Sequence, residues 1–140
     1  MDLQDFPFTM EPFQHQIEHL RQHVNDKSWG LLWEQGTAKT KPIIETAALK
    51  FSEGSIDGLL VVAPPGVERN WNTDEIPKHL PPEFALDTMV QVFSTARKHT
   101  QAHKRSMNAA MNYVGLSVLL ISYNAFMTAE GKKLVWGFLK

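Results

Sequence analysis

Four short runs of aliphatic and aromatic residues stand out along the chain, separated by longer stretches that mix apolar and polar positions. The runs cover Trp29 to Trp33, Leu59 to Ala63, Met89 to Phe93 and Val118 to Ser122. Each run is as long as a β-strand and almost unbroken, which is typical of strands covered on both faces in a parallel sheet. The pattern therefore predicts an α/β fold, with a mostly parallel sheet and flanking helices.

Helical periodicity and proline positions predict one helix before the first strand and one helix after each of the first three strands. An apolar stripe over Ile17, Leu20 and Val24 predicts a first helix, which Pro12 opens. The other predicted helices each follow one of the first three strands and cover Thr40 to Phe51, Gly66 to His79 and Thr95 to Tyr113. The helix over 66–79 is expected to end at a group of prolines, Pro77, Pro81 and Pro82.

Composition limits the classes of protein to which the chain belongs. It has 140 residues, of which 43% are hydrophobic and 21% charged, so one core is feasible and one domain is expected. Residues 10–140 are expected to form it, with residues 1–9 as an N-terminal tail. The chain has no cysteine, which excludes disulfides, thiolate metal sites and cysteine nucleophiles. No signal peptide or membrane-spanning run is recognisable, so a cytoplasmic location without membrane partners is expected.

Positive charge gathers late in the chain. Residues 1–80 hold seven Lys and Arg against twelve Asp and Glu, a net charge of −5, whereas residues 81–140 hold seven against three, a net charge of +4. The densest cationic stretch contains Arg97, Lys98, Lys104 and Arg105. Such a stretch is suited to contact nucleic-acid phosphates. The alternative is a solvated helix face.

A candidate phosphate loop lies between the first predicted strand and the helix that follows it. Its residues are Gly36, Thr37, Ala38, Lys39 and Thr40. In such loops backbone N–H groups surround phosphate oxygens, a lysine reaches the β- and γ-phosphates, and a threonine hydroxyl ligates magnesium. Lys39 and Thr40 suit those two roles. The alternative is a loop with an exposed lysine, because the strict motif requires glycine where the chain has Ala38.

A second motif predicts different chemistry. His15, Glu18 and His19 match an inverted zinc-protease signature, in which two histidines four residues apart share one helix face. A catalytic zinc of that class needs a further glutamate ligand, which this pattern does not identify. An exposed helix face is the better interpretation of a five-residue match.

Polar residues follow two of the predicted strands. Pro64 to Asn70 comes after the strand ending at Ala63, and Ser122 to Asn124 ends the last strand. Ligands of open α/β sheets bind at the carboxyl ends of the strands, so these segments and the phosphate loop are expected to share one functional edge. The alternatives are a helix N-cap at Ser122 or Asn124 and, for Trp71, a packing role in the core.

The order of these segments resembles the first lobe of a superfamily 2 helicase-like ATPase of the Swi/Snf type, especially phage versions, over about Met10 to Gly131. Phe13 to Gln16 resembles the adenine-reading motif, with Gln16 as the matching residue, and Leu32 to Thr40 resembles the phosphate loop. The resemblance implies nucleic-acid backbone contacts for one set of residues, Pro64, Arg69, Asn70, Ser122 and Tyr123.

The fold that this resemblance implies is an incomplete RecA-like lobe with ATP and Mg²⁺ as cofactors, and double-stranded DNA as partner. The location implied is the cytoplasm of a bacterial or phage-infected host cell. The family's Asp-Glu box and second lobe would follow Lys140, so no catalytic residue and no ATP hydrolysis are expected of this chain alone. The alternative function is a non-catalytic nucleic-acid or protein-binding module with a degenerate phosphate loop, because Ala38 replaces the family's glycine.

The resemblance also has a consequence for strand pairing. In this family two strands separate the strand before the phosphate loop from the strand ending at Ala63, and both would follow Lys140. The strand Trp29 to Trp33 is therefore expected to pair with the remainder of the protein or with a second copy of the chain. Otherwise the sheet closes in another order and the phosphate loop is distorted.

Overall fold

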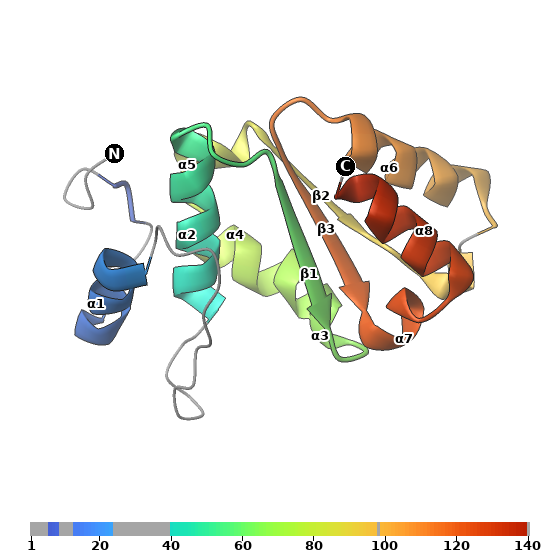
Figure 1. Ribbon diagram of the computed structural model, residues 1–140, viewed down its shortest axis with the longest axis horizontal. Helices are drawn as coiled ribbons and strands as arrows, with labels where there is room; N and C mark the ends of the chain where they lie inside the picture. The colour runs from blue at the N-terminus through green and yellow to red at the C-terminus, as the bar shows by residue number, and fades with distance from the viewer. Residues whose placement is uncertain (1–5, 9–12, 24–39, 98, 140) are drawn as a thin grey trace.

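The computed structural model describes residues 6–8, 13–23, 40–97 and 99–139, and its described part is an α/β structure (Figure 1). The strands are β1 (Gly58–Ala63), β2 (Thr88–Val92) and β3 (Leu116–Ser122). The helices are α1 (Gln14–His23), α2 (Thr40–Ser52), α3 (Val67–Asn70), α4 (Ile76–His79), α5 (Pro82–Ala85), α6 (Gln101–Asn112), α7 (Tyr123–Phe126) and α8 (Ala129–Phe138). A π-helical turn, η1, covers Trp71–Glu75 and a 3-10 turn, η2, covers Thr95–Arg97.

The three strands form an open parallel sheet in the order β1-β3-β2. β3 is the middle strand, and its Ser122 lies opposite Ala63 at the end of β1. This arrangement confirms the predicted α/β class and three of the predicted strands to within two residues at each end. The predicted strand Trp29 to Trp33 and the phosphate-loop residues 36–39 lie outside the described residues.

Alternate residues of β3 enter two separate cores. Leu116, Val118 and Leu120 pack with the layer that contains α2, α4 and α5, whereas Leu119 and Ile121 pack with the layer that contains α6 and α8. Successive side chains of a strand point to opposite faces, so a strand that is apolar at every position requires cover on both sides. The apolar run of β3 is therefore unbroken because helices cover both faces of the sheet.

Helix α2 begins at Thr40, as predicted, and ends one residue beyond the expected Phe51. Its second residue, Lys41, is buried and donates a hydrogen bond to the buried carboxylate of Glu45 one turn later. Burial raises the pKa of Glu45, and the charge of Lys41 opposes that rise. The Lys41 ammonium also lies over the ring of Phe8 at 5.2 Å from its centroid. The Lys41 ammonium is therefore buried and held by groups within the chain.

The helical stretch after β1 ends at His79, as predicted, and is divided into α3, η1 and α4. Pro77 lies inside the helical stretch 67–79, and the helix ends at His79, where Leu80 turns to an extended conformation. The π turn η1 precedes Pro77 and brings the Ile76 N–H to the carbonyl of Trp71. A proline removes one helical donor, and a π turn adds a residue without ending the helix. Trp71 packs against the core, which confirms its predicted packing role.

Two differences from the predicted elements lie near the C-terminal half. The helix expected over 95–113 is divided, because Thr100 is extended and its hydroxyl accepts the His103 N–H at 3.2 Å, so that α6 begins only at Gln101. Helix α8 is not anticipated, although Thr128 caps it by accepting the Gly131 N–H at 3.0 Å. A threonine cap before an apolar stripe is the signal that predicts such a helix.

Part of the expected N-terminal tail is anchored. Phe6 is 5% exposed and stacks on Phe84, with ring centroids 6.0 Å apart, while Phe8 lies edge-on to Phe6 at 4.9 Å. Both side chains belong to the core that α2 covers. Among the helices of the described ranges, none is long and apolar enough to cross a membrane.

Replacing Phe6→Ala is expected to lower the free energy of unfolding by about 3 kcal/mol or more, because the change removes a buried aromatic side chain and leaves a cavity. Leu86→Ala is the matched control, since Leu86 is 88% exposed, and is expected to change stability by less than about 0.5 kcal/mol. Urea unfolding followed by circular dichroism measures both. Equal stability of the two variants would show that the N-terminal anchor contributes nothing.

Candidate functional site

A crevice of about 660 Å³ opens where the three strands end. Its walls come from the segments that follow β1, β2 and β3, at the lower side of the sheet in Figure 1. The lining residues are Pro65, Gly66, Glu68, Arg69, Asn72, Thr73, Val92, Phe93, Ser94, Thr95, Ala96, Arg97, Ser122, Asn124 and Ala125. This is the edge at which ligands of parallel α/β sheets bind.

The turn after β1 forms the first wall. The Val67 N–H donates to the carbonyl of Pro64 at 3.0 Å, and Gly66 between them has a φ of 92°. Residues that carry a side chain rarely adopt a φ of this sign. Glycine is therefore required for the chain to turn directly from the strand into α3. The turn brings Glu68 and Arg69 to the crevice within six residues of the strand.

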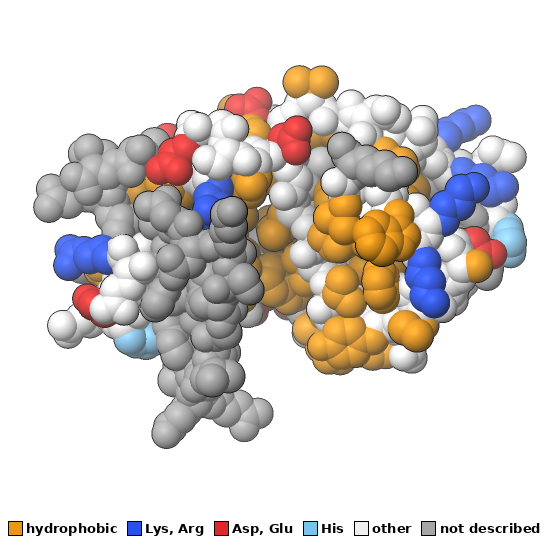
Figure 2. Space-filling model, in the orientation of Figure 1, with side chains coloured by type: hydrophobic (Ala, Val, Ile, Leu, Met, Phe, Trp, Pro, Cys, Tyr) orange, Lys and Arg blue, Asp and Glu red, His pale blue; other side chains and the backbone are white. Residues whose placement is uncertain are grey.

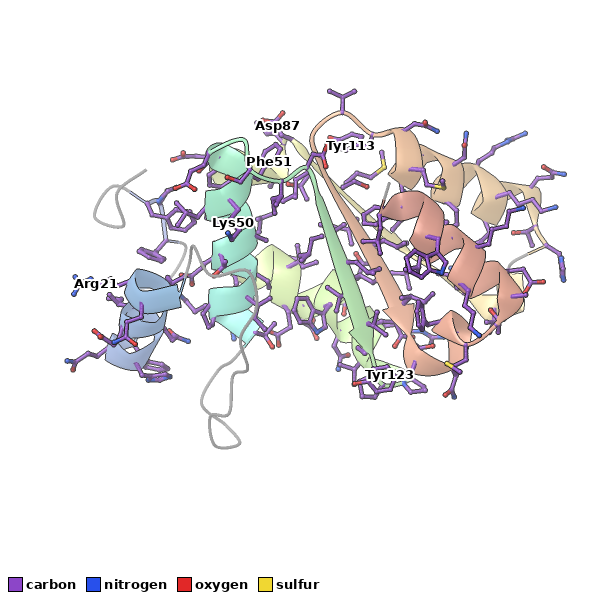
Figure 3. All side chains as sticks on the ribbon, in the orientation of Figure 1. Arg21, Lys50, Phe51, Asp87, Tyr113 and Tyr123 are labelled. Atoms are coloured by element: carbon purple, nitrogen blue, oxygen red, sulfur yellow. The ribbon has the colours of Figure 1, made fainter. Side chains whose placement is uncertain are left out.

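The end of β3 forms the second wall. Ser122 is buried, and its hydroxyl accepts the Ala125 N–H at 3.2 Å, so it caps α7. Of the two residues that the sequence offers as a helix cap here, Ser122 and Asn124, the cap lies at Ser122. Tyr123 is exposed at the same edge of the sheet and does not line the crevice (Figure 3).

The segment after β2 forms the third wall, and His103 of α6 holds it. The Ser94 N–H donates to Nε2 of His103 at 3.4 Å, and the rings of Phe93 and His103 lie 5.3 Å apart. Burial lowers the pKa of His103, and the positive charge of Arg97 lowers it further. A neutral imidazole with Nε2 as acceptor is therefore the form that supports this wall.

The charges at the crevice differ in exposure. Arg69 and Arg97 are exposed, whereas Glu68 is only 7% exposed. The Glu68 Oε2 atom is buried and has no hydrogen-bond partner among the described residues. The crevice is therefore lined by two exposed arginines, by hydroxyl groups and by one buried carboxylate.

The structure brings together only some of the residues singled out from the sequence. Arg69, Arg97 and Ser122 line the crevice, and Pro64 and Asn70 flank it without lining it. Lys104 lines a different groove between α6 and α8, Arg105 lines neither, and Lys98 lies outside the described residues. Glu68 belongs to the segment 64–70 that is expected at this edge, whereas four further lining residues are not among those expected from the sequence, namely Asn72, Thr73, Ser94 and Thr95. Ser94 and Thr95 follow a predicted strand directly, which is the signal that indicates them.

The expected nucleotide-binding residues are placed in part. Thr40 begins α2, whose N-terminus lies toward the same side of the sheet as the strand ends (Figure 1). Gly36, Thr37, Ala38 and Lys39 lie outside the described residues. Gln16 is fully buried, and its Oε1 accepts the Phe13 N–H at 2.8 Å. That bond caps the start of α1, as the third helical residue does in a capping box.

The zinc-like motif is described at one of its histidines. His15 is exposed and stacks on Phe13, with ring centroids 5.7 Å apart. The side chain of His19 lies outside the described residues. In the part of the chain that the structure describes, no three His, Asp or Glu side chains are grouped so as to hold a metal ion.

Comparisons with protein-family models, with curated proteins and with solved structures find no match for this chain. The architecture itself, an open parallel sheet of three described strands with flanking helices, is shared by folds with many functions.

Acidification is expected to weaken the third wall of the crevice. The folded-state pKa of His103 lies below its ordinary value, so its contribution to stability is complete above about pH 6.5 and is lost as the pH falls below that value. A glutamine accepts the same hydrogen bond but does not titrate. The stability difference between the wild type and His103→Gln should shrink between about pH 7.5 and 5.5, measured by urea unfolding. A constant difference would contradict this role.

Proposed function

We propose that this chain is the ATP-binding part of a nucleic-acid-dependent, helicase-like ATPase, and that the crevice at the strand ends takes the nucleic-acid backbone. The supporting observation is the convergence of Arg69, Arg97 and Ser122 from the ends of three different strands. No catalytic residue is assigned within this chain. The proposal joins that geometry to the resemblance of the motif order.

The chemistry of the crevice suits a phosphodiester backbone. Guanidinium groups donate to phosphate oxygens, and Ser94, Thr95 and Asn124 add uncharged hydroxyl and amide groups at the same edge. Backbone contacts of this kind hold a nucleic acid without reading its sequence. The buried carboxylate of Glu68 lines the same crevice.

The nucleotide is proposed to lie at the N-terminus of α2. A thirteen-residue helix presents unpaired N–H groups and a positive dipole end at its start, which favours phosphate. Because Lys41 is buried and paired with Glu45, Lys39 is the lysine assigned to phosphate in this proposal. Thr40 is assigned to magnesium, as the resemblance implies. The resemblance also assigns Gln16 to adenine, a role that would require its buried amide to leave the Phe13 N–H.

Ala38 favours a second candidate function. Its methyl group stands where the family's glycine allows close approach of the backbone to phosphate. A chain that lost nucleotide binding would keep the crevice and act as a non-catalytic nucleic-acid or protein-binding module. Nucleotide titration separates this alternative from the first proposal.

Charge reversal at the crevice is expected to abolish DNA binding. The double variant Arg69→Glu/Arg97→Glu should lose affinity for a duplex oligonucleotide, and the slope of log affinity against log salt should fall by about 0.9 for each phosphate contact removed. Lys132→Glu is the matched control, because Lys132 is exposed on α8 and does not line the crevice. Fluorescence anisotropy at several salt concentrations measures both. Equal binding by the double variant and the control would refute the assignment.

Nucleotide binding is expected to be weak and to depend on Lys39. Calorimetric titration with ATP and Mg²⁺ should show affinity that Lys39→Ala removes, because the lysine supplies the charge opposite the phosphates. Ala38→Gly should strengthen binding by removing the methyl group. Lys50→Ala, near the other end of α2, serves as the control. Identical titrations for all variants would favour the non-catalytic module.

A further inference from the structure

A second hollow, away from the strand ends, lies between α6 and α8. It is an open groove of about 730 Å³. The lining residues are Phe93, His103, Lys104, Met107, Asn108, Met111, Glu130, Lys133, Leu134, Trp136 and Gly137. It shares only Phe93 with the crevice. The proposed nucleic-acid and nucleotide contacts leave its apolar residues unused.

The groove exposes large apolar side chains. Trp136 is 65% exposed and Met111 46% exposed, and beneath them Met107 and Leu134 join the core under α6 and α8. Figure 2 shows these helices as a concentrated hydrophobic area with lysine and arginine side chains along one side. Tryptophan and methionine are enriched where proteins bind other proteins, and methionine adapts its shape to different partners.

Gly137 opens one end of the groove. A Cβ atom at this position would lie 2.7 Å from Cε of Met111, so a side chain here would require the flexible methionine to shift. The tip of Met111 therefore lies against the backbone of α8. The result is a channel between two helices, with a flexible methionine on one wall and an indole ring on the other.

The charges beside the groove select the partner. Lys104 lines it from α6 and Lys133 from α8, against one acidic residue, Glu130. Two copies of the chain that met through this face would bring these lysines near one another, which disfavours a second copy. An acidic partner meets opposite charge instead. The open shape of the groove suits an elongated element more than a small enclosed ligand.

We propose that the groove between α6 and α8 binds a short amphipathic helix of a partner protein, with apolar side chains on one face and carboxylates beside them. The apolar face packs on Met107, Met111 and Trp136, and the carboxylates lie near Lys104 and Lys133. This is the helix-in-groove mode of peptide recognition, in which apolar anchors recur every three to four residues.

The test uses the full chain and a synthetic helix of about 18 residues, with leucines on one face and glutamates flanking that face. Its twin carries lysines in place of the glutamates. Anisotropy of the labelled peptides should show that the acidic helix binds at least about tenfold more tightly than the basic one. Trp136→Ala should weaken binding by about tenfold or more, because a central tryptophan carries much of such an interface.

Matched variants separate the charge effect from folding. Lys133→Glu should weaken binding about fivefold, whereas Lys132→Glu, one residue away and outside the groove lining, should leave it within about twofold. Leu86→Ala controls for loss of an exposed apolar side chain. Because Trp136, Lys132 and Lys133 are exposed, their variants are expected to have the same midpoint of urea unfolding as the wild type.

Three results would overturn the proposal. The first is no binding of the acidic helix at concentrations up to about 1 mM. The second is binding that neither Trp136→Ala nor Lys133→Glu weakens. The third is a dimer in sedimentation that Trp136→Ala dissociates, which would assign the face to a second copy of the chain.

Discussion

The described structure depends on the burial of β3 between two layers of helices. Leu119, Leu120 and Ile121 have no exposed surface, and the strand is paired in parallel on both edges. A strand in this position leaves only its two ends accessible, because every side chain and every backbone group between them is covered or paired. The functional surfaces must therefore lie where the strands end or on the outer faces of the helices.

The crevice follows directly from that constraint. Parallel strands end at the same edge, so three segments that are distant in the sequence bring Arg69, Arg97 and Ser122 together. Each segment is held by a local device, namely the glycine turn at Gly66, the serine cap of α7 and the hydrogen bond from Ser94 to His103. These three local interactions do not depend on one another, and the parallel sheet brings the segments that they hold to the same edge. A charge pattern that is scattered along the chain becomes one surface.

The groove between α6 and α8 arises differently. The inner faces of these helices cover β3 through residues such as Met107 and Val135. Trp136 of α8 and Met111 of α6 are exposed to solvent and are not needed to cover the sheet. Apolar side chains that do not contribute to the core indicate a second use, because exposed aromatic and methionine clusters favour association. The groove and the crevice share only Phe93, so the proposed partner helix and the proposed nucleic acid would occupy different sites.

The sequence by itself determined the α/β class, the three described strands and the start of α2, because unbroken apolar runs and a proline in the first turn of a helix are local signals. It also indicated Arg69 and Ser122, since both follow a predicted strand. It did not indicate Ser94 as a partner of His103, the π turn before Pro77, or the separation of Lys104 from Arg97. Those features depend on which helix covers which face and where each cap lies. Only tertiary packing decides them, because the atoms that meet are distant along the chain or lie on faces that periodicity alone does not orient.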